Sequence, residues 1–156
     1  MQTRPLTKAD YAKIVSVIDQ WWEGPTSALA HPIFFYELGR LARVVESDAE
    51  LVGFLFGFVA PEAQPFRSFS RTDPEQIGYV HLVGIHPDFR RRGVARVLYA
   101  AFEDDCRAVG CVALKAITTH GNSGSVRFHV ALGWSVTDVD DYAGPGRSRI
   151  VFEKRL

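Results

Sequence analysis

The sequence predicts a single α/β domain in which a mixed β-sheet is covered by helices. Its 156 residues, 47% of them hydrophobic, are enough for one substantial core and leave no room for a second domain. Short β-rich runs surround a strand, helix, strand, helix segment, and there is neither an internal repeat nor a low-complexity tract. We therefore treat residues 1–156 as one domain.

The first third of the chain is predicted to hold a strand and two helices. Residues 3–6 suit a short strand, and Thr7 with Asp10 three positions later forms a short capping box for a helix. Apolar residues at helical spacing follow, at Tyr11, Ile14, Val15, Ile18 and Trp22. The Gly-Pro pair at 24–25 is expected to end this helix, and a shorter helix is expected over residues 32–38.

The middle of the chain predicts a hairpin, a long loop and a further strand. The β-rich runs 41–46 and 51–59 are joined by a polar four-residue connection, which favours an antiparallel hairpin. The stretch 60–76 contains three prolines and predicts a flap or loop. Residues 78–85 are predicted to form a strand, in which Gly84 indicates either a bulge or a close approach by another backbone.

The most regular helix of the sequence is predicted to begin at Gly93. Its apolar residues form one helical stripe, and Gly110 ends it. The elements expected after it are a strand over residues 111–117, a helix over residues 122–132, a strand from Trp134, a turn over residues 140–146 and a final strand over residues 148–154.

Charge and composition exclude several classes of protein. Eighteen basic and eighteen acidic residues balance, so no global field attracts nucleic acid or an anionic membrane. No apolar run approaches the roughly 20 residues that span a bilayer, and the polar start lacks the order of a secretory signal, so we expect a soluble, cytoplasmic protein. Cys106 and Cys111 are expected to be reduced and buried, and no ligand spacing indicates a metal site.

The clearest chemical signal lies between the end of a strand and the start of the most regular helix. The residues there are Arg90, Arg91, Arg92, Gly93, Val94 and Ala95. Unpaired N–H groups at a helix start, combined with positive charge, form an anion site. Gly93 lets the backbone approach a phosphate, small Ala95 leaves the helix start uncluttered, and an arginine can pair with phosphate oxygens. A diphosphate is the ligand that fits, and a solvated basic turn is the alternative.

A family resemblance narrows the identity of that diphosphate. The P-loop and dinucleotide glycine motifs are both absent. The pattern Arg/Gln-x-x-Gly-x-Gly/Ala after a strand instead resembles the coenzyme A pyrophosphate motif of the GNAT superfamily of N-acyltransferases. The resemblance covers nearly the whole chain and is carried by Arg4-Pro5-Leu6-Thr7 with Asp10, Val83-Gly84-Ile85-His86-Pro87, Asn122-Ser123-Gly124-Ser125 and Phe128-His129-x-x-Leu132-Gly133-Trp134. Residues 21–25 also resemble a bacterial branch whose members mostly lack an assigned substrate.

The resemblance implies a fold and an activity. The fold is a mixed, mostly antiparallel twisted sheet of about six to seven strands, splayed at a central bulge and flanked by about four helices. The activity is transfer of an acetyl group from acetyl-CoA to a primary amine of a small molecule or peptide, by direct attack in a ternary complex. It implies that Gly84 forms the bulge, that the backbone of Val83 and Ile85 holds the pantetheine arm, that residues 91–95 hold the pyrophosphate, and that Asn122 and Ser125 lie at the pantetheine or its water shell.

Three residues are the catalytic candidates. By the same resemblance, the N–H of Val83 stabilises the oxyanion of the tetrahedral intermediate. His129 occupies the position of the family's usual tyrosine, so it either protonates the departing thiolate or only hydrogen-bonds the thiol. As the base we rank His81 ahead of Tyr79, on the same face of its strand, and of Glu75, because a histidine titrates near neutrality.

The sequence is also compatible with two other functions. The missing tyrosine motivates a non-catalytic module that binds acyl-CoA and senses it. The arginine run motivates a nucleic-acid-binding loop, which the zero net charge disfavours. Aromatic residues near the first helices, and a resemblance to relatives that are often dimers, suggest a homodimer. The acceptor is expected to contact residues 21–35 and the flap that precedes Gly78.

Overall fold

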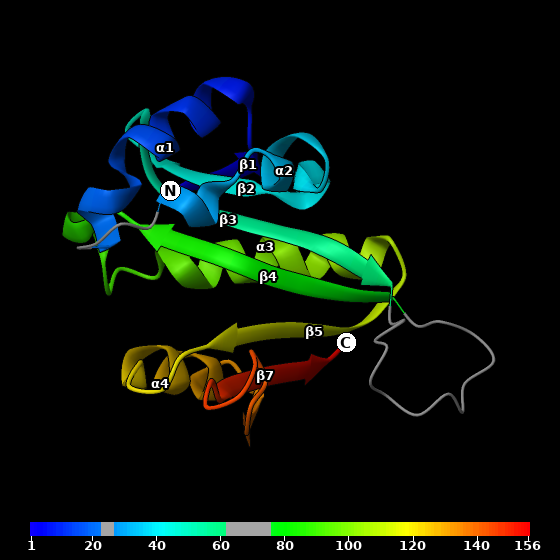
Figure 1. Cartoon of the computed structure of the whole chain (residues 1–156). Coiled ribbons are helices and arrows are strands. Elements are labelled where there is room, and N and C mark those ends of the chain that lie inside the picture. The colour runs from blue at the N-terminus through cyan, green and yellow to red at the C-terminus, as the bar shows by residue number, and fades with distance from the viewer. Residues whose placement is uncertain (23–26, 62–75) are drawn as a thin grey trace.

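A computed structural model describes residues 1–22, 27–61 and 76–156. They form a seven-stranded sheet in the order β1-β2-β3-β4-β5-β7-β6 (Figure 1). The strands are β1 (Gln2–Pro5), β2 (Arg43–Ser47), β3 (Glu50–Pro61), β4 (Gln76–Ile85), β5 (Cys111–Thr118), β6 (Ser135–Val139) and β7 (Arg149–Arg155). β4 and β5 run parallel and the other neighbouring pairs run antiparallel. The predicted mixed, mostly antiparallel sheet is confirmed.

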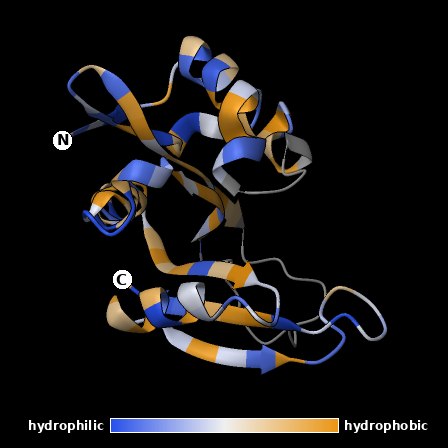
Figure 2. Ribbon diagram, turned by 90° about the vertical axis from the view of Figure 1, so that its left-hand side faces the viewer, coloured by the Kyte–Doolittle hydropathy of each residue, from blue (hydrophilic) through white to orange (hydrophobic). Residues whose placement is uncertain are grey.

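Helices cover both faces of this sheet. They are α1 (Lys8–Trp22), α2 (Ile33–Tyr36), α3 (Val94–Ala108) and α4 (Ser123–Ala131). One core lies between the sheet and α1 with α2, and a second core lies between the opposite face and α3 with α4. Figure 2 shows the strands and the helices banded in orange and blue, as expected for elements that turn one side to a core. None of the described helices is long and apolar enough to cross a membrane.

The predicted start of the first helix is confirmed. The backbone N–H of Thr7 donates to Asp10 Oδ2 (2.8 Å), and the N–H of Asp10 donates to Thr7 Oγ1 (3.3 Å). Arg4 of β1 donates to the same carboxylate (2.6 Å) and to Glu46 of β2 (2.5 Å). This network ties the first strand and helix to the sheet, and the Arg4 guanidinium lowers the pKa of Asp10 to about 2.

The turn of the first hairpin and the length of the second helix differ from the expectation. The hairpin of β2 and β3 is confirmed, but Ser47 pairs with Glu50, so its turn contains only Asp48 and Ala49, with φ of 52° and 63°. Two such left-handed residues match the right-handed twist of the strands they join. The helix expected over residues 32–38 is a single turn, α2. The flap expected over residues 60–76 falls largely on residues 62–75, outside the described residues, as does the expected helix stop at 24–25.

The other predicted elements are present, with ends shifted by one or two residues. Cys106 on α3 and Cys111 at the start of β5 are both buried and carry free thiols. Burial raises the pKa of both thiols. These cysteines are therefore packing residues of the core beneath α3.

Candidate functional site

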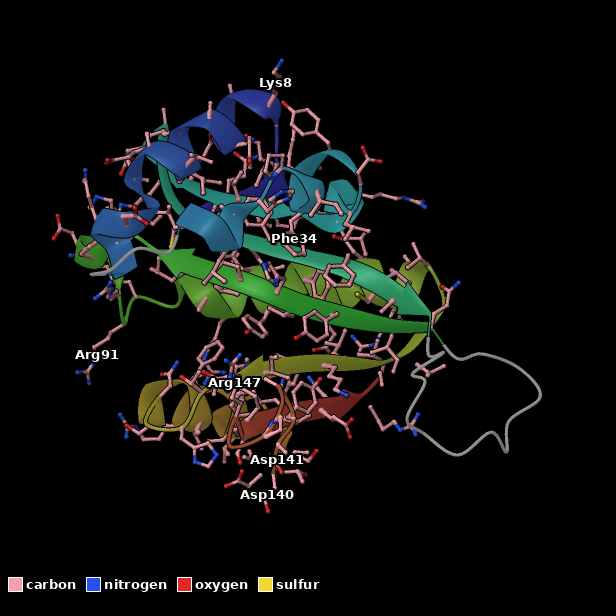
Figure 3. The ribbon with its side chains drawn as sticks, in the orientation of Figure 1. Lys8, Phe34, Arg91, Asp140, Asp141 and Arg147 are labelled. Carbon is pink, nitrogen blue, oxygen red and sulfur yellow. The ribbon has the colours of Figure 1, made fainter. Side chains whose placement is uncertain are left out.

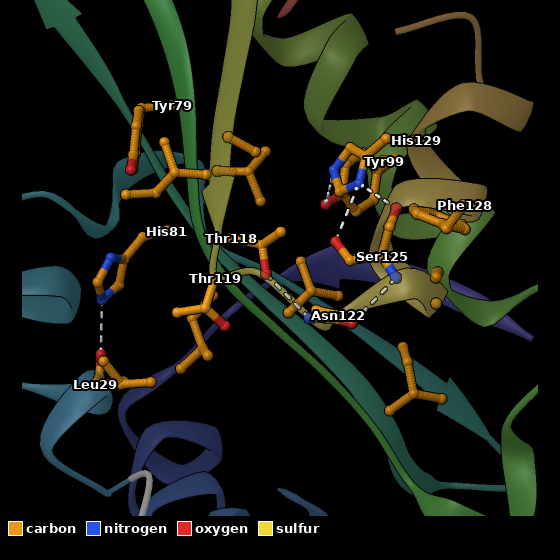
Figure 4. A pocket seen from close by; sticks show the side chains of 18 of the residues that line it. Leu29, Tyr79, His81, Tyr99, Thr118, Thr119, Asn122, Ser125, Phe128 and His129 are labelled. Carbon is orange, nitrogen blue, oxygen red and sulfur yellow. Dashed lines mark hydrogen bonds between the residues drawn. The ribbon is translucent and has the colours of Figure 1, made fainter. Parts of the chain in front are cut away.

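A cavity of about 910 Å³ opens where β4 and β5 separate (Figure 4). The two parallel strands pair from Gln76 to Val80 on β4 and from Cys111 to Ala116 on β5. Beyond these residues the described part of β4 pairs with β3 and that of β5 with β7. Figure 1 shows the two strands diverging towards their carboxyl ends. Carboxyl ends of parallel strands are where ligands bind in related sheet architectures.

Many of the predicted site residues meet in this cavity. It is lined by His81, Val83, Ile85, Arg90, Ala95, Asn122, Ser125 and His129 from the predicted set. Tyr79, an alternative base, also lines it, whereas Glu75 lies outside the described residues. Within the part of the chain that the structure describes, no group of three or more His, Cys, Asp or Glu side chains is arranged to hold a metal ion.

The bulge in β4 lies at His81 and not at Gly84. Phe56 of β3 lies opposite Leu82, and the next residue of β3 lies opposite Val80. His81 is therefore the extra residue that an antiparallel bulge inserts. The predicted position at Gly84 is wrong, because Gly84 continues the regular ladder.

Gly84 is required for a different reason. It lies opposite Phe54, and a Cβ on Gly84 would come within 2.3 Å of that ring. Phe54 is fully buried, so the ring has no space into which it could move. The atoms that exclude a Cβ from this position belong to the side chain of Phe54, and not to a bulge or to another backbone, the two alternatives that the sequence indicated.

The backbone of β4 presents polar groups to the cavity at alternate residues. The N–H of His86 donates to the carbonyl of Val52 on the β3 side (2.9 Å). In an antiparallel strand the backbone N–H and C=O groups of every second residue point to the same neighbouring strand. Those of Gly84 therefore point to β3 as well. Val83 and Ile85 then direct their N–H and C=O groups to the side from which β5 has diverged. These groups suit hydrogen bonds to an extended ligand arm.

His81 lies on one side of the separated strands and is held by two contacts (Figure 4). Its Nε2 lies 2.8 Å from the carbonyl oxygen of Leu29, and its ring stacks on Phe34 at 3.7 Å between centroids. A carbonyl only accepts, so Nε2 carries a proton and neutral His81 has its lone pair on Nδ1. Burial lowers the pKa of His81, against the smaller raising effect of the Leu29 hydrogen bond. Burial also raises the pKa of Tyr79, on the same side, to about 12, which makes Tyr79 the weaker candidate for a base.

His129 lies on the other side of the strands, on α4 (Figure 4). Its side chain is buried and stacks on Phe152 of β7 at 3.9 Å between centroids. Nδ1 lies 2.9 Å from the carbonyl of Ser125, so Nδ1 is the donor, and Nε2 lies 3.1 Å from the hydroxyl of Tyr99. Burial lowers the pKa of His129. In the neutral ring Nε2 therefore accepts a hydrogen bond from Tyr99.

Tyr99 of α3 is a site residue that the sequence reasoning missed. It lines the cavity, it is buried, and burial raises the pKa of its hydroxyl. One signal was available in the sequence. Tyr99 lies between Leu98 and Phe102 on the buried face of its helix, and a buried phenol hydroxyl needs a polar partner.

The loop before α3 has the backbone of an anion site. Arg91 and Gly93 both have left-handed conformations, with φ of 62° and 85°, and flank Arg92. Loops of this kind bring successive N–H groups together at a helix start. A Cβ on Gly93 would meet no atom within 4 Å, so the space in front of the helix is open. The residues present therefore fit a diphosphate.

The arginines of this loop have different surroundings. Arg90 lines the cavity and donates a hydrogen bond to the carbonyl of Trp21 at the end of α1. Arg91 is exposed and points away from the protein in Figure 3. Arg92 packs over the ring of Phe89, with 5.2 Å from its guanidinium carbon to the ring centroid. The side chain of Val94 is buried in the core, so only its backbone faces the loop.

Asn122 joins the start of α4 to the end of β5 at the cavity. Its Oδ1 accepts a hydrogen bond from the N–H of Ser125 (3.2 Å), and its Nδ2 donates to Thr118 Oγ1 (3.0 Å). Asn122 is therefore the N-cap of α4. Asn122 thus fixes the wall of the cavity that faces β4.

Comparisons with known proteins agree with the resemblance drawn from the sequence. A model of the acetyltransferase (GNAT) family matches residues 11–134. Similar solved structures include Naa20 of Chaetomium thermophilum in complex with a bisubstrate analogue, with a TM-score of 0.77 and 19% identity over 100% of this chain and 87% of that chain. They also include Ard1 of Thermoplasma volcanium, with a TM-score of 0.74 and 20% identity over 99% and 97%. A ribosomal-protein-alanine N-acetyltransferase of Brucella melitensis has a TM-score of 0.69 and 18% identity over 100% of both chains. No curated protein sequence matches this chain.

Proposed function

Because the chain belongs to the acetyltransferase (GNAT) family, we propose that it transfers the acetyl group of acetyl-CoA to a primary amine by direct attack in a ternary complex. Family membership makes the protein an acetyl-CoA-dependent N-acetyltransferase. The acceptor and the acting residues are the proposal. The observation that carries it is the cavity at the carboxyl ends of β4 and β5, with backbone groups on one wall and a histidine on each side.

The acetyl-CoA half of the cavity is the side of α3 and α4. The N–H groups of residues 91–95 bind the pyrophosphate, supported by the left-handed turn and the open space at Gly93. Val83 and Ile85 hydrogen-bond the pantetheine arm as an added strand, and Asn122 and Ser125 lie on the facing wall.

The acceptor half is the side of His81. A neutral amine attacks the thioester carbonyl, and its proton passes to Nδ1 of His81, directly or through one water. The Leu29 carbonyl holds the required tautomer, and the lowered pKa keeps the ring neutral near pH 7. The N–H of Val83 stabilises the oxyanion, a contribution of about 3 kcal/mol at comparable sites.

Tyr99 and His129 act together at the departing thiolate. Nδ1 of His129 is engaged by Ser125, and Nε2 by the Tyr99 hydroxyl. Tyr99 has one hydroxyl proton, which it donates to Nε2 of His129 in the free protein. We therefore propose that His129 orients this hydroxyl and that the hydroxyl turns to the thiolate as the thiolate departs. The thiolate then takes a proton from solvent, and His81 releases the amine proton to solvent. Direct proton donation by His129, one of the two roles that the sequence left open for it, is the alternative.

Acceptors of two kinds fit this scheme, small amines and peptide amines. The neighbour named for acetylation of a ribosomal-protein alanine supports a peptide or protein amine. The homodimer expected from the sequence stays a prediction.

Binding and turnover test the proposal separately. Acetyl-CoA should raise the melting temperature by mass action, whereas an oligonucleotide should not. Release of free thiol in the presence of an amine panel then distinguishes an enzyme from a sensor. Binding of acetyl-CoA without thiol release for any amine would support the sensor, and no thermal shift at millimolar acetyl-CoA would exclude both functions.

The role of His81 is tested by the pH dependence of kcat. The wild type should lose rate as pH falls through a pKa below 6.5, where Nδ1 becomes protonated. His81→Gln should lower kcat by about 10²-fold and remove this acidic limb. The matched control is His120→Gln, since His120 is exposed and pairs with Asp138 outside the cavity. An unchanged acidic limb in His81→Gln would exclude His81 as the base.

A further inference from the structure

An arginine that the catalytic proposal does not use lines the acceptor half of the cavity. Arg149 is the first residue of β7, and it lines the cavity together with Thr118 of β5. The next residue of β7, Ile150, pairs with Thr118 at the end of β5. Arg149 therefore lies at the end of the sheet where β4 and β5 have separated. Arg149 belongs to none of the motifs recognised in the sequence.

The alternation along β7 places Arg149 on the acceptor face of the sheet. Phe152 of the same strand stacks on His129, on the α4 face. Side chains alternate between the two faces of a strand, so Arg149, three residues before Phe152, lies on the opposite face. That is the side on which Figure 4 shows Tyr79 and His81.

The other residues of that face support this placement. Glu153 lies four residues after Arg149 on β7 and therefore on the same face. It pairs with Lys115 of β5 (4.0 Å between Nζ and Oε1). Lys115 lies opposite Tyr79 in the parallel ladder of β4 and β5. Arg149 therefore belongs to the same face as the proposed base.

The guanidinium of Arg149 has no carboxylate partner among the described residues. Its one hydrogen bond there is from Nη1 to the carbonyl of Ser148 (2.9 Å), and the side chain is part-buried. The two carboxylates of the preceding turn are engaged elsewhere, because Asp141 accepts from the N–H of Gly146 (2.6 Å) and Asp140 from the hydroxyl of Ser148 (3.3 Å). In Figure 3 both point outward from the turn.

The charge of the cavity lining is therefore positive. The charged side chains among its described residues are Arg90 and Arg149, and no Asp or Glu is among them. Arg90 belongs to the loop before α3 and donates to the carbonyl of Trp21, whereas Arg149 lies on the acceptor face, where an anionic group of the acceptor would enter. A part-buried guanidinium binds a carboxylate or phosphate by strong, charge-assisted hydrogen bonds. Positive charge also lowers the pKa of a nearby amine, which favours the neutral form that attacks.

We propose that the acceptor amine carries an anionic group, and that Arg149 binds this group. The proposal rests on the proposed function and names the substrate class of the same cavity. A polyamine or a lysine-rich segment does not match a lining whose charges are both positive. Aromatic residues of the lining, Trp21 and Tyr79 among them, favour an apolar group on the same acceptor.

Matched acceptor pairs test the proposal with the full-length protein. Phenylalanine is compared with phenylalaninamide, and a peptide whose second residue is Asp with the same peptide carrying Asn. Spermidine represents the polyamines. Thiol release gives kcat/KM, expressed per neutral amine because the members of a pair differ in amine pKa. We expect the anionic member of at least one pair to be preferred by about 10-fold or more, as for hydrogen bonds to charged groups. The pair that shows the preference distinguishes a free amino acid from an acidic peptide.

The variant Arg149→Gln identifies the residue responsible. It should abolish the preference by lowering kcat/KM for the anionic member, and change the rate for the uncharged member less than about 2-fold. The control is Arg147→Gln, which removes an equal charge from the exposed turn before β7 and should keep the preference. An unchanged thermal shift by acetyl-CoA in both variants shows that the fold and the cosubstrate site are intact.

Two outcomes would overturn this inference while the proposed function stands. One is thiol release that favours spermidine or the uncharged members. The other is a preference for anions that Arg149→Gln leaves in place. Absence of thiol release with every amine would instead count against the proposed function, so the two failures are distinguishable.

Discussion

Asp10 shows how one residue joins three elements. Its carboxylate caps α1, accepts from Arg4 of β1, and through Arg4 is linked to Glu46 of β2. The guanidinium lowers the pKa of Asp10 to about 2, against 3.8 for the free side chain. A carboxyl whose pKa is lowered by folding stabilises the protein above its unfolded pKa, and that stability is lost as pH falls through its folded pKa.

We therefore expect Asp10→Asn to lower the free energy of unfolding by about 2 kcal/mol at pH 7. The difference between the variant and the wild type should shrink between pH 4 and pH 2, where the wild-type carboxylate becomes protonated. Urea denaturation at pH 7 and at pH 2.5 measures both values. A difference that does not depend on pH would assign the loss to the helix cap and not to the ion pair.

Tyr99 and His129 make a second prediction at the scale of residues. Tyr99→Phe removes the proposed donor to the thiolate and should lower kcat by about 10²-fold. His129→Gln should lower kcat less, because a glutamine oxygen can still accept from the Tyr99 hydroxyl. Stopped assays of thiol release at saturating acetyl-CoA compare the two variants.

The reverse order of effects would make His129 itself the proton donor. Tyr99→Phe also leaves Nε2 of His129 without its partner in the core, which should cost about 1–3 kcal/mol of stability. A melting curve and a retained thermal shift by acetyl-CoA therefore accompany each rate, so that unfolding is not mistaken for loss of catalysis.

Among the elements, the β2–β3 hairpin contains a correctable strain. Ala49 has a φ of 63°, a conformation that costs an L-residue other than Gly, Asn or Asp about 1–2 kcal/mol. Glycine adopts it freely but loses more entropy on folding. Ala49→Gly should therefore raise the free energy of unfolding by about 0.5–1 kcal/mol, measured by urea denaturation.

A glycine at the neighbouring position is the control for this gain. Asp48 has a φ of 52°, but aspartate tolerates the left-handed region better than alanine does. Asp48→Gly is expected to leave the stability nearly unchanged. Equal gains at both positions would mean that turn flexibility, and not the conformation of Ala49, limits the hairpin.

The helices and strands themselves follow mainly from local pattern. The apolar stripe before Gly110 predicted α3, and the Thr7–Asp10 box predicted the start of α1, because both signals arise between residues one turn apart. The short α2 was predicted as longer. Its length is set by packing of aromatic residues against β3 and α1, contacts that its own sequence does not contain.

At the scale of the whole molecule, the separation of β4 and β5 divides the sheet into two parts that a ligand would bridge. The structure presents the N–H groups of Val83 and Ile85 to the cavity, whereas those of Leu82 and Gly84 face β3. Amide hydrogen exchange should therefore be fast at Val83 and Ile85 in the free protein and slow once acetyl-CoA is bound.

Leu82 and Gly84 are the internal control, and their exchange should be slow in both states. NMR measurement of exchange at single residues resolves this alternation. Equal protection at all four residues by acetyl-CoA would indicate a general stiffening of β4 and would contradict an added-strand contact at Val83 and Ile85.

The sequence by itself determined what neighbouring residues decide: the helix caps, the amphipathic stripe of α3 and the arginine-glycine turn that forms an anion site. Such signals can be recognised from the sequence because the interacting groups are one turn or one strand pair apart. Only the tertiary structure decided where the strands separate, that the bulge lies at His81, and that Tyr99 and Arg149 line the cavity. These depend on contacts between segments some 30 to 70 residues apart, such as Tyr99 with His129 and Arg90 with Trp21. No local pattern encodes the chain packing that brings them together.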